Sequence, residues 1–299
     1  MRIANIVYEI IYHRNINFIL RKLNKYLRKF IPNIKLPPSG LIKIKTTSGT
    51  IKIETNQTSY LTQLLFWKGY KNFEYSEIFE DIIKDKRCFL DIGSNIGYYS
   101  LLASLSNPNI CVIAFEPAIG PKYYLDKNIK LNKVENQIKS FDIALSNSSG
   151  IIDFYEVENI KYKNLKYNLA GEGNAGTKTK SRNFKKRQVL TTTLDQFVKQ
   201  HNLDNIDIIK LDTEGTEIDI LNNGKNTIIN NQPIIICETL FNTTEKELED
   251  FFKPLDYLFF NHMNNKLIQA STIVRNKDNG IRNCFFIPKS KIELISKYI

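Results

Sequence analysis

The strongest chemical signal in the sequence is a turn of small and polar residues after a short apolar run. Residues 88–92 are predicted to form a buried strand with Asp91 near its end, and a helical pattern begins at Gly97. Gly93 permits a tight turn, and Gly97 permits close approach of a ligand to the backbone. The turn lacks the Gly-Lys-Ser/Thr of a P-loop and the glycine spacing of a dinucleotide site. A carboxylate here suits a cationic ligand better than a pyrophosphate, although an isolated Asp-Gly turn can also be purely structural.

A second acidic residue follows the next predicted strand. Residues 110–115 end in Glu116-Pro117, and Glu116 comes 25 residues after Asp91. An acid at this position can accept hydrogen bonds from both hydroxyls of a ribose. Asp91 and Glu116 together therefore indicate a nucleoside site with a positive charge nearby. S-adenosylmethionine (SAM) combines a ribose and an adenine with an ammonium and a sulfonium, and it fits this site.

Two more carboxylates, Asp212 and Glu214, follow the predicted strand 206–211. Ligands of parallel sheets bind at the carboxyl ends of the strands, so these acids should lie beside the first two. They could deprotonate an acceptor, orient a hydroxyl or hold a divalent metal, with Asp212 as the metal ligand. Acids also favour the first turn of a helix, so a solvated helix N-terminus is the alternative.

Aromatic and histidine side chains supply the remaining candidates. Trp67 and Tyr70 are candidates for stacking on a sugar ring, with core packing as the alternative. His262 ends a predicted strand and is a rival catalytic base, as is His201; a structural role is the alternative for both. The sequence has no C-x-x-C pair, which favours free thiols in a reducing compartment over disulfides or a metal site. The four cysteines are Cys88, Cys111, Cys237 and Cys284.

These residues need a scaffold that brings strand ends together, and the hydrophobic pattern predicts one. Predicted strands at 88–92, 110–115, 137–145, 206–211 and 233–240 alternate with predicted helices at 74–85, 97–106, 121–131, 194–201, 217–229 and 243–252. In the last helix, Thr244 and Glu247 have capping-box spacing. The pattern is completed by a hairpin at 41–54, by strands at 151–157 and 188–193 around a polar insert, and by late strands at 257–262 and 284–288. The prediction is an α/β fold with a doubly wound, mostly parallel sheet.

Five segments, in order, resemble the FkbM family of methyltransferases. They are DIGSNIG at 91–97, FEP at 115–117, DIALS at 142–146, TLD at 193–195 and KLDTEGTE at 210–217. The resemblance covers residues 61–289 and implies a Rossmann-like class I methyltransferase fold, with seven strands and an antiparallel last strand. It also implies SAM contacts from Asp91, Gly93, Asn95, Gly97 and Glu116, an adenine contact from Asp142, and acceptor roles for Asp212 and Glu214. The residue at the position of Asp142 is more usually asparagine. At the position of Asn95, methyltransferases outside the family usually have glycine.

The net charge of +11 is concentrated in two segments. Residues 1–35 carry eight basic residues and one acidic residue, and residues 178–187 carry six basic residues and no acid. The rest of the chain is nearly neutral, unlike a generally basic nucleic-acid-binding protein.

The proline-containing run at 35–40 divides a predicted helical extension, residues 1–39, from a methyltransferase domain, residues 40–299. Helices within residues 5–30 are expected to be amphipathic and basic. They would either pack on the domain or dock on an anionic membrane or a partner. The chain has no apolar run of 18 residues and no signal-peptide cleavage site, so neither a transmembrane helix nor a signal peptide is expected. We therefore expect a cytoplasmic protein, with peripheral attachment at the inner membrane face as a further option.

The insert loop spans residues 158–187, and its part 169–187, which contains Gly171, Gly173 and Gly176, is predicted to form a mobile lid over the acceptor. Its residues Lys185, Lys186 and Arg187 would hold an anionic group. The combined prediction is a SAM-dependent O-methyltransferase acting on a hydroxyl of a saccharide or glycan precursor. The alternatives are a methyltransferase for nucleic acid or another anionic acceptor, and a non-catalytic SAM-binding scaffold. The nucleic-acid signal is weak, because Phe184 is the only aromatic residue in the basic run.

Overall fold

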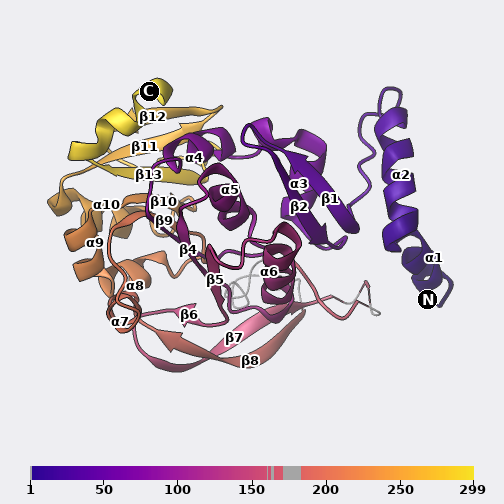
Figure 1. Ribbon diagram of the computed structural model, residues 1–299, viewed down its shortest axis with the longest axis horizontal. Helices are drawn as coiled ribbons and strands as arrows, with labels where there is room; N and C mark the ends of the chain where they lie inside the picture. The colour runs from indigo at the N-terminus through magenta and orange to yellow at the C-terminus, as the bar shows by residue number, and fades with distance from the viewer. Residues whose placement is uncertain (1, 160, 163–164, 171–182) are drawn as a thin grey trace.

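The computed structural model describes residues 2–159, 161–162, 165–170 and 183–299. Its centre is an eight-stranded sheet in the order β12-β11-β13-β10-β9-β3-β4-β5 (Figure 1). These strands are β3 (Cys88–Ile92), β4 (Cys111–Phe115), β5 (Ile138–Phe141), β9 (Ile206–Leu211), β10 (Ile234–Glu238), β11 (Tyr257–Met263), β12 (Lys266–Ala270) and β13 (Asn283–Pro288). Strands β5, β4, β3, β9 and β10 pair in parallel, and β13 is antiparallel to β10 and β11. The predicted doubly wound sheet with an antiparallel last strand is confirmed, and β12 adds an eighth strand at one edge.

Helices cover both faces of this sheet. One face packs against α4 (Ser76–Ile82), α5 (Tyr98–Ser106) and α6 (Ile119–Asn132). The other packs against α7 (Leu194–Gln200), α8 (Glu217–Asn222), α9 (Lys225–Asn231) and α10 (Glu245–Phe252). Successive strand residues enter opposite cores: Phe89 belongs to the first and Leu90 to the second. Because both faces are covered, the central strands are almost wholly apolar, and a polar residue inside one of them is conspicuous.

Smaller elements surround the main sheet. The hairpin of β1 (Gly40–Lys45) and β2 (Thr50–Thr55) is as predicted, and α3 (Tyr60–Lys68) follows it. A second sheet has the order β6-β8-β7, with β6 (Ala144–Leu145), β7 (Gly150–Glu158) and β8 (Asn183–Thr192). Short 3₁₀-helices occupy Tyr70–Asn72, Lys253–Leu255 and Lys289–Tyr298. The four cysteines are free thiols, as predicted.

Four local predictions are wrong in detail. The strand expected at 137–145 is two strands in different sheets, because the chain leaves the main sheet at the exposed residue Asp142. The insert ends earlier than expected, since β8 begins at Asn183 and pairs along β7. The helix expected at 217–229 is broken at Gly224, where a side chain would collide with Leu194. Thr244 forms no capping hydrogen bond with its side chain.

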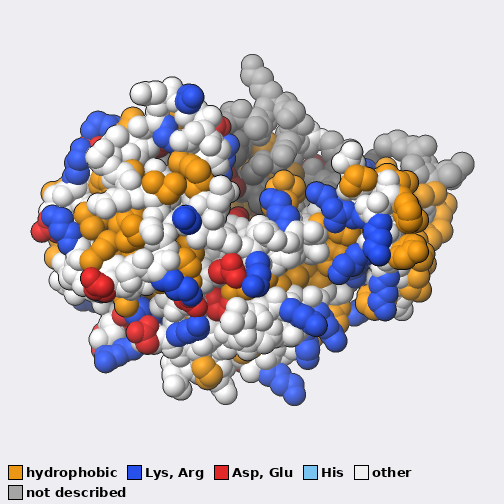
Figure 2. All heavy atoms as spheres, turned by 90° about the horizontal axis from the view of Figure 1, so that it is seen from above, with side chains coloured by type: hydrophobic (Ala, Val, Ile, Leu, Met, Phe, Trp, Pro, Cys, Tyr) orange, Lys and Arg blue, Asp and Glu red, His pale blue; other side chains and the backbone are white. Residues whose placement is uncertain are grey.

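The N-terminal extension forms two helices, α1 (Arg2–Tyr12) and α2 (Arg14–Leu27), at one end of the molecule (Figure 1). Figure 2 shows hydrophobic side chains gathered at this end, with lysine and arginine side chains beside them. None of the described helices is long and apolar enough to cross a membrane.

Candidate functional site

A crevice of about 1320 Å³ opens at the carboxyl ends of the central strands. Its lining includes residues that follow or end β3, β4, β9 and β10: Gly93, Asn95, Glu116, Asp212, Glu214 and Glu238. Further walls come from α3, from residues 165–170, and from β7 and β8. The topology therefore brings the predicted turn, the predicted ribose acid and the two predicted acceptor acids into one crevice.

The turn after β3 depends on two glycines. Gly93 has a φ of 75°, and a Cβ atom there would lie 1.9 Å from the backbone oxygen of Asp212. Gly97 has a φ of 87°, and a Cβ atom there would lie 2.5 Å from Leu125 Cδ1. Larger residues at either position would push the turn away from β9 or α6, so the glycines allow the turn to pack tightly against its neighbours.

Asp91 supports this turn from below. It is fully buried, and its Oδ2 accepts hydrogen bonds from Ser100 N at 3.1 Å and Ser100 Oγ at 2.5 Å. These bonds fix the first turn of α5. The crevice lining includes neither Asp91 nor Gly97, so the structure places them behind the site, whereas Gly93 and Asn95 face it.

Glu116 joins the ends of β3 and β4. Its Oε2 accepts a hydrogen bond from Asn95 N at 2.8 Å, and its Oε1 accepts one from Ala118 N at 2.9 Å. Burial raises its pKa to about 7, although the two backbone donors act in the opposite direction. Each carboxylate oxygen can accept a further hydrogen bond, so Glu116 keeps capacity for a ligand's hydroxyl donors.

Lys210 is a buried cation beneath the crevice, and its role was not predicted. It lies on β9 with 4% of its surface exposed. Its Nζ lies 3.1 Å from Asp212 Oδ2 and 3.6 Å from Asp91 Oδ1, and it donates to Gly93 O at 3.3 Å. Burial opposes its charge, but the carboxylates of Asp212 and Asp91 outweigh burial and raise its pKa above the ordinary lysine value. The sequence signal was a lysine between Ile209 and Leu211 in an otherwise apolar strand.

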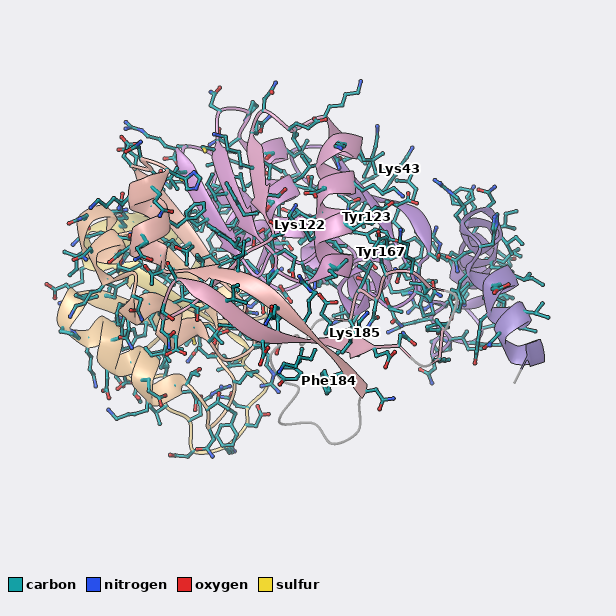
Figure 3. The ribbon with its side chains drawn as sticks, turned by 90° about the horizontal axis from the view of Figure 1, so that it is seen from below. Lys43, Lys122, Tyr123, Tyr167, Phe184 and Lys185 are labelled. Carbon is teal, nitrogen blue, oxygen red and sulfur yellow. The ribbon has the colours of Figure 1, made fainter. Side chains whose placement is uncertain are left out.

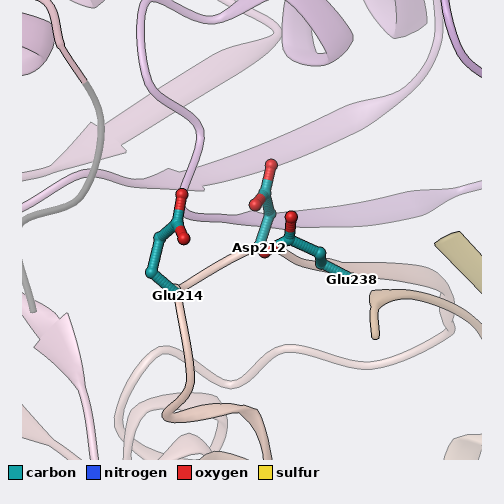
Figure 4. Close-up of side chains that lie close together, drawn as sticks. All are labelled: Asp212, Glu214 and Glu238. Carbon is teal, nitrogen blue, oxygen red and sulfur yellow. The ribbon is translucent and has the colours of Figure 1, made fainter. Parts of the chain in front are cut away.

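Three carboxylates lie together above Lys210. Asp212, Glu214 and Glu238 each offer one oxygen that lies within 4.8 Å of the others (Figure 4). Burial, and then the charge of Asp212, raise the pKa of Glu238 to about 9. Glu238 was not predicted, although its position at the end of β10 obeys the same strand-end rule as Glu116.

Glu74 reaches the crevice from the segment before α4. Its Oε2 accepts a hydrogen bond from Tyr99 OH at 2.8 Å. Desolvation in the crevice, and then the charge of Asp212, raise its pKa to about 7. Nothing in the spacing of the polar residues around Glu74 distinguished it from a surface acid.

The aromatic residues of the crevice differ from those predicted. Tyr60 of α3 and Tyr167 line it, and the Tyr167 ring stacks on Tyr123 of α6 with 4.3 Å between centroids (Figure 3). By contrast, Trp67 donates from Nε1 to Leu36 O at 3.1 Å, beside the N-terminal extension. Tyr70 is buried and donates to the Glu80 carboxylate. The structure therefore gives no support to Trp67 or Tyr70 as substrate contacts.

The three predicted basic contacts of the insert separate in the structure. Lys185 lines the crevice from β8 (Figure 3). Lys186 pairs with Asp153 at 2.7 Å, and Arg187 pairs with Glu156 at 3.1 Å. Lys185 therefore remains a candidate, while its two neighbours have structural partners on β7. Gly171, Gly173 and Gly176 of the predicted lid lie outside the described residues.

The predicted adenine contact and the two histidines lie away from the crevice lining. Asp142 is exposed, whereas its neighbours Ile143 and Ala144 line the crevice. The His262 ring lies 6.0 Å from the Tyr75 ring, and burial lowers its pKa to about 4. His201 stacks on Phe197 at 4.1 Å. These positions favour structural roles for both histidines.

The chain is similar to known methyltransferases. The sequence model described as the Methyltransferase FkbM domain matches residues 91–267. The chain is 28% identical over 194 residues to methyltransferase sdnD of Sordaria araneosa, covering 56% of this chain and 73% of the relative. It is 33% identical over 96 residues to 31-O-demethyl-FK506 methyltransferase FkbM of Streptomyces tacrolimicus, covering 28% of this chain and 34% of that protein.

Among solved structures, the chain is similar to a methyltransferase FkbM from Methylobacillus flagellatus KT. The identity is 14% and the TM-score 0.45, and the match covers 77% of this chain and 54% of that one. The chain thus spans about half of the solved protein and about a third of the Streptomyces relative.

Proposed function

Because the chain belongs to the FkbM methyltransferase family, we propose that it transfers a methyl group from SAM to a hydroxyl of a saccharide or glycan precursor. The observation that carries this proposal is the buried carboxylate of Glu116 at the end of β4, in the same crevice as Asp212 at the end of β9. The first suits a ribose, and the second suits an acceptor hydroxyl.

The crevice fits SAM by the chemistry of its lining. Glu116 would accept hydrogen bonds from the ribose hydroxyls. Pro117, Ile143 and Ala144 provide apolar contacts for an adenine. The carboxylate of Glu74 would compensate the positive charge of the ligand. When bound, SAM supplies a methyl group already activated as a sulfonium.

Asp212 is the residue that we propose as the proton acceptor, with Glu214 beside it. Its side chain is 44% exposed, and Lys210 holds its Oδ2 at 3.1 Å. This contact fixes the orientation of the carboxylate while its other oxygen is available for a hydroxyl. An alcohol near neutral pH must lose its proton as it attacks, and a positioned carboxylate can receive that proton.

A saccharide acceptor is supported by the size and the rings of the crevice. Its volume exceeds the roughly 300–1,000 Å³ of a typical small-molecule pocket, so it has room for two ligands. The rings of Tyr60 and Tyr167 offer flat surfaces for the carbon–hydrogen face of a sugar. Lys185 would bind a phosphate or carboxylate on the same acceptor.

Calorimetric titration with SAM tests the cofactor half of the proposal. Glu116→Ala should weaken SAM binding by at least about tenfold, because it removes two hydrogen bonds to a charged group, each worth roughly 1.5–3 kcal/mol. The control is Glu135→Ala, which removes an exposed acid outside the crevice lining. Equal affinities for the two variants would contradict the assigned site.

Transfer of labelled methyl groups to a panel of acceptors tests the other half. We expect sugars and sugar phosphates to be labelled, and Asp212→Asn to reduce kcat by about 10²–10⁴-fold without loss of SAM binding. Labelling of RNA but not of sugars would show that the saccharide assignment is wrong.

A further inference from the structure

Helix α2 attaches to the rest of the protein through polar side chains. Asn17, Arg21 and Asn24 are buried and follow each other at helical spacing on one face. Asn17 accepts a hydrogen bond from Ser39 N at 2.8 Å, and Arg21 donates to Leu41 O at 3.2 Å. The inner face of α2 is therefore polar, and most of the large apolar side chains of the same helix are exposed, Leu20 being partly buried.

The outward face of the extension is apolar. Of the 23 large hydrophobic side chains that are exposed in the described residues, 12 lie between Ile6 and Ile34. In α2 they recur at intervals of three and four residues, which makes a continuous stripe: Ile16, Ile19, Leu23 and Leu27. Ile19 is 58% exposed and Leu23 is 54% exposed. Clustered exposure of this kind marks an interaction surface rather than ordinary surface composition (Figure 2).

Lysines flank the apolar stripe on one side. Lys22 and Lys25 are exposed on the face of α2 next to it, and the exposed Lys29 follows in the turn after the helix. The Lys22 Nζ lies 4.5 Å from the centre of the Phe18 ring, so cation and apolar ring adjoin. Glu9 is the only acidic residue in positions 1–39. The surface thus combines apolar area with almost unopposed positive charge, which is complementary to anionic headgroups above acyl chains.

The two helices are held in a fixed position relative to the domain. The α1 rings of Tyr8 and Tyr12 meet the Tyr162 ring edge-on, with centroids 5.3 Å and 5.5 Å apart. Arg14 lies 3.6 Å from Glu54 of β2. The apolar stripe is therefore presented by a positioned element.

We propose that the outward face of the N-terminal extension, residues 6–34, docks on the surface of an anionic lipid bilayer. With 14 residues, α2 is about 21 Å long, which is too short to span a bilayer but suits a helix lying in its interface. The apolar stripe would enter the boundary between headgroups and acyl chains, and the lysines would contact lipid phosphates or carboxylates. This proposal does not depend on the reaction that the crevice catalyses.

Vesicle co-sedimentation of the full chain tests the proposal, with phosphatidylcholine vesicles compared with vesicles that also contain phosphatidylserine. We expect binding to the anionic vesicles. The double variant Ile19→Gln/Leu23→Gln should bind them at least about tenfold more weakly, because apolar burial supports interfacial binding. The triple variant Lys22→Gln/Lys25→Gln/Lys29→Gln should lose about a hundredfold in affinity for anionic vesicles only.

Ile151→Gln/Leu190→Gln is the matched control, because these paired residues of β7 and β8 are 62% and 61% exposed but lie outside the extension. It should bind like the unaltered chain, and circular dichroism should show all variants folded. Equal vesicle binding by the control and the Ile19/Leu23 variant would overturn the proposal. Absence of vesicle binding would also overturn it. This includes the outcome in which sedimentation velocity shows that the chain self-associates through the stripe. Because no SAM or acceptor is present, failure here is separate from failure of the proposed methyl transfer.

Discussion

At the scale of single residues, the site rests on the buried charges of Asp91 and Lys210 and on the partly exposed Asp212 that pairs with the same lysine. Lys210 lies between Asp91 and Asp212, and none of the three can be replaced without changing the balance around the others. Removing Asp91 from its buried pair with Lys210 should cost roughly 3–5 kcal/mol, because the remaining charge is left uncompensated, whereas the exposed side of Asp212 is screened by solvent. The group therefore supports the turn after β3 and the orientation of Asp212 at the same time.

His262 provides a prediction about pH. Its pKa is about 4 in the folded protein and near 6.5 when unfolded, so the unfolded chain binds more protons between these values. The stability contributed by neutral His262 should therefore be complete above about pH 6.5 and be lost as the pH falls toward 4. His262 is partly exposed, so the loss should be at most about 3 kcal/mol.

Urea unfolding of the protein and of His262→Gln at pH 7.5 and 5 measures this difference. The variant should lose less stability on acidification and should keep its methyl-transfer kcat. A large fall in kcat for this variant at pH 7.5 would restore His262 as a catalytic candidate.

At the scale of elements, the alternation of side chains along β8 gives its neighbouring basic residues different surroundings. Neighbouring residues of a strand point to opposite faces, so Lys185 can face the crevice while Lys186 pairs with Asp153. The strand β8 tolerates these basic residues because its partner strand, β7, carries acidic residues that pair with them. The contribution of one lysine to acceptor binding can therefore be separated from that of the next.

Lys185→Ala should raise the KM for a phosphorylated or carboxylated acceptor by about tenfold, with SAM affinity unchanged, because one charge-assisted contact is lost. Lys186→Ala is its control and should leave both quantities unchanged. Steady-state kinetics with both variants makes the comparison. An equal rise of KM in the two would mean that general charge, rather than the position of Lys185, attracts the acceptor.

At the scale of the whole molecule, the crevice gathers segments that are distant in the chain, from α3 to β10. Ligand binding should therefore reduce hydrogen exchange in separate segments together. Since Glu116 holds the amides of Asn95 and Ala118, SAM should slow exchange at 93–97 and 116–120 and leave α1 and α2 unchanged. Mass spectrometry of deuterated peptides measures this pattern, and protection confined to α1 and α2 would be inconsistent with the assigned site.

The parts of this arrangement that could be predicted follow from strand alternation. Apolar runs located the central strands, and the rule that ligands bind at strand ends then located Glu116, Asp212 and Glu214 near one another. Thr193 and Asp195 were recognised from the resemblance. In the structure, Thr193 caps α7 through Gln196 N, and Asp195 accepts a hydrogen bond from Thr227 N at 2.8 Å, so both join helices rather than line the site.

The parts that could not be predicted depend on tertiary contacts. Glu74 reaches the site because the segment before α4 packs against α5, where Tyr99 donates to Glu74, and the sequence placed Glu74 only as the first residue of the predicted helix 74–85. An amphipathic helix usually packs its apolar face on the protein, but α2 packs its polar face, because side-chain-to-backbone hydrogen bonds of Asn17 and Asn24 replace apolar packing. Hydrophobic periodicity alone cannot distinguish an apolar stripe that faces the core from one that faces outward.

The separation of the two faces of α2 has an evolutionary consequence. The residues that anchor the helix are Asn17, Arg21 and Asn24, and the residues that would choose its target are on the other side. Selection can therefore alter the outer face without endangering the fold of the catalytic domain. Under the docking proposal, exchanges on the outer face would change the surface that the protein binds, while Asn17, Arg21 and Asn24 would continue to hold the helix on the domain.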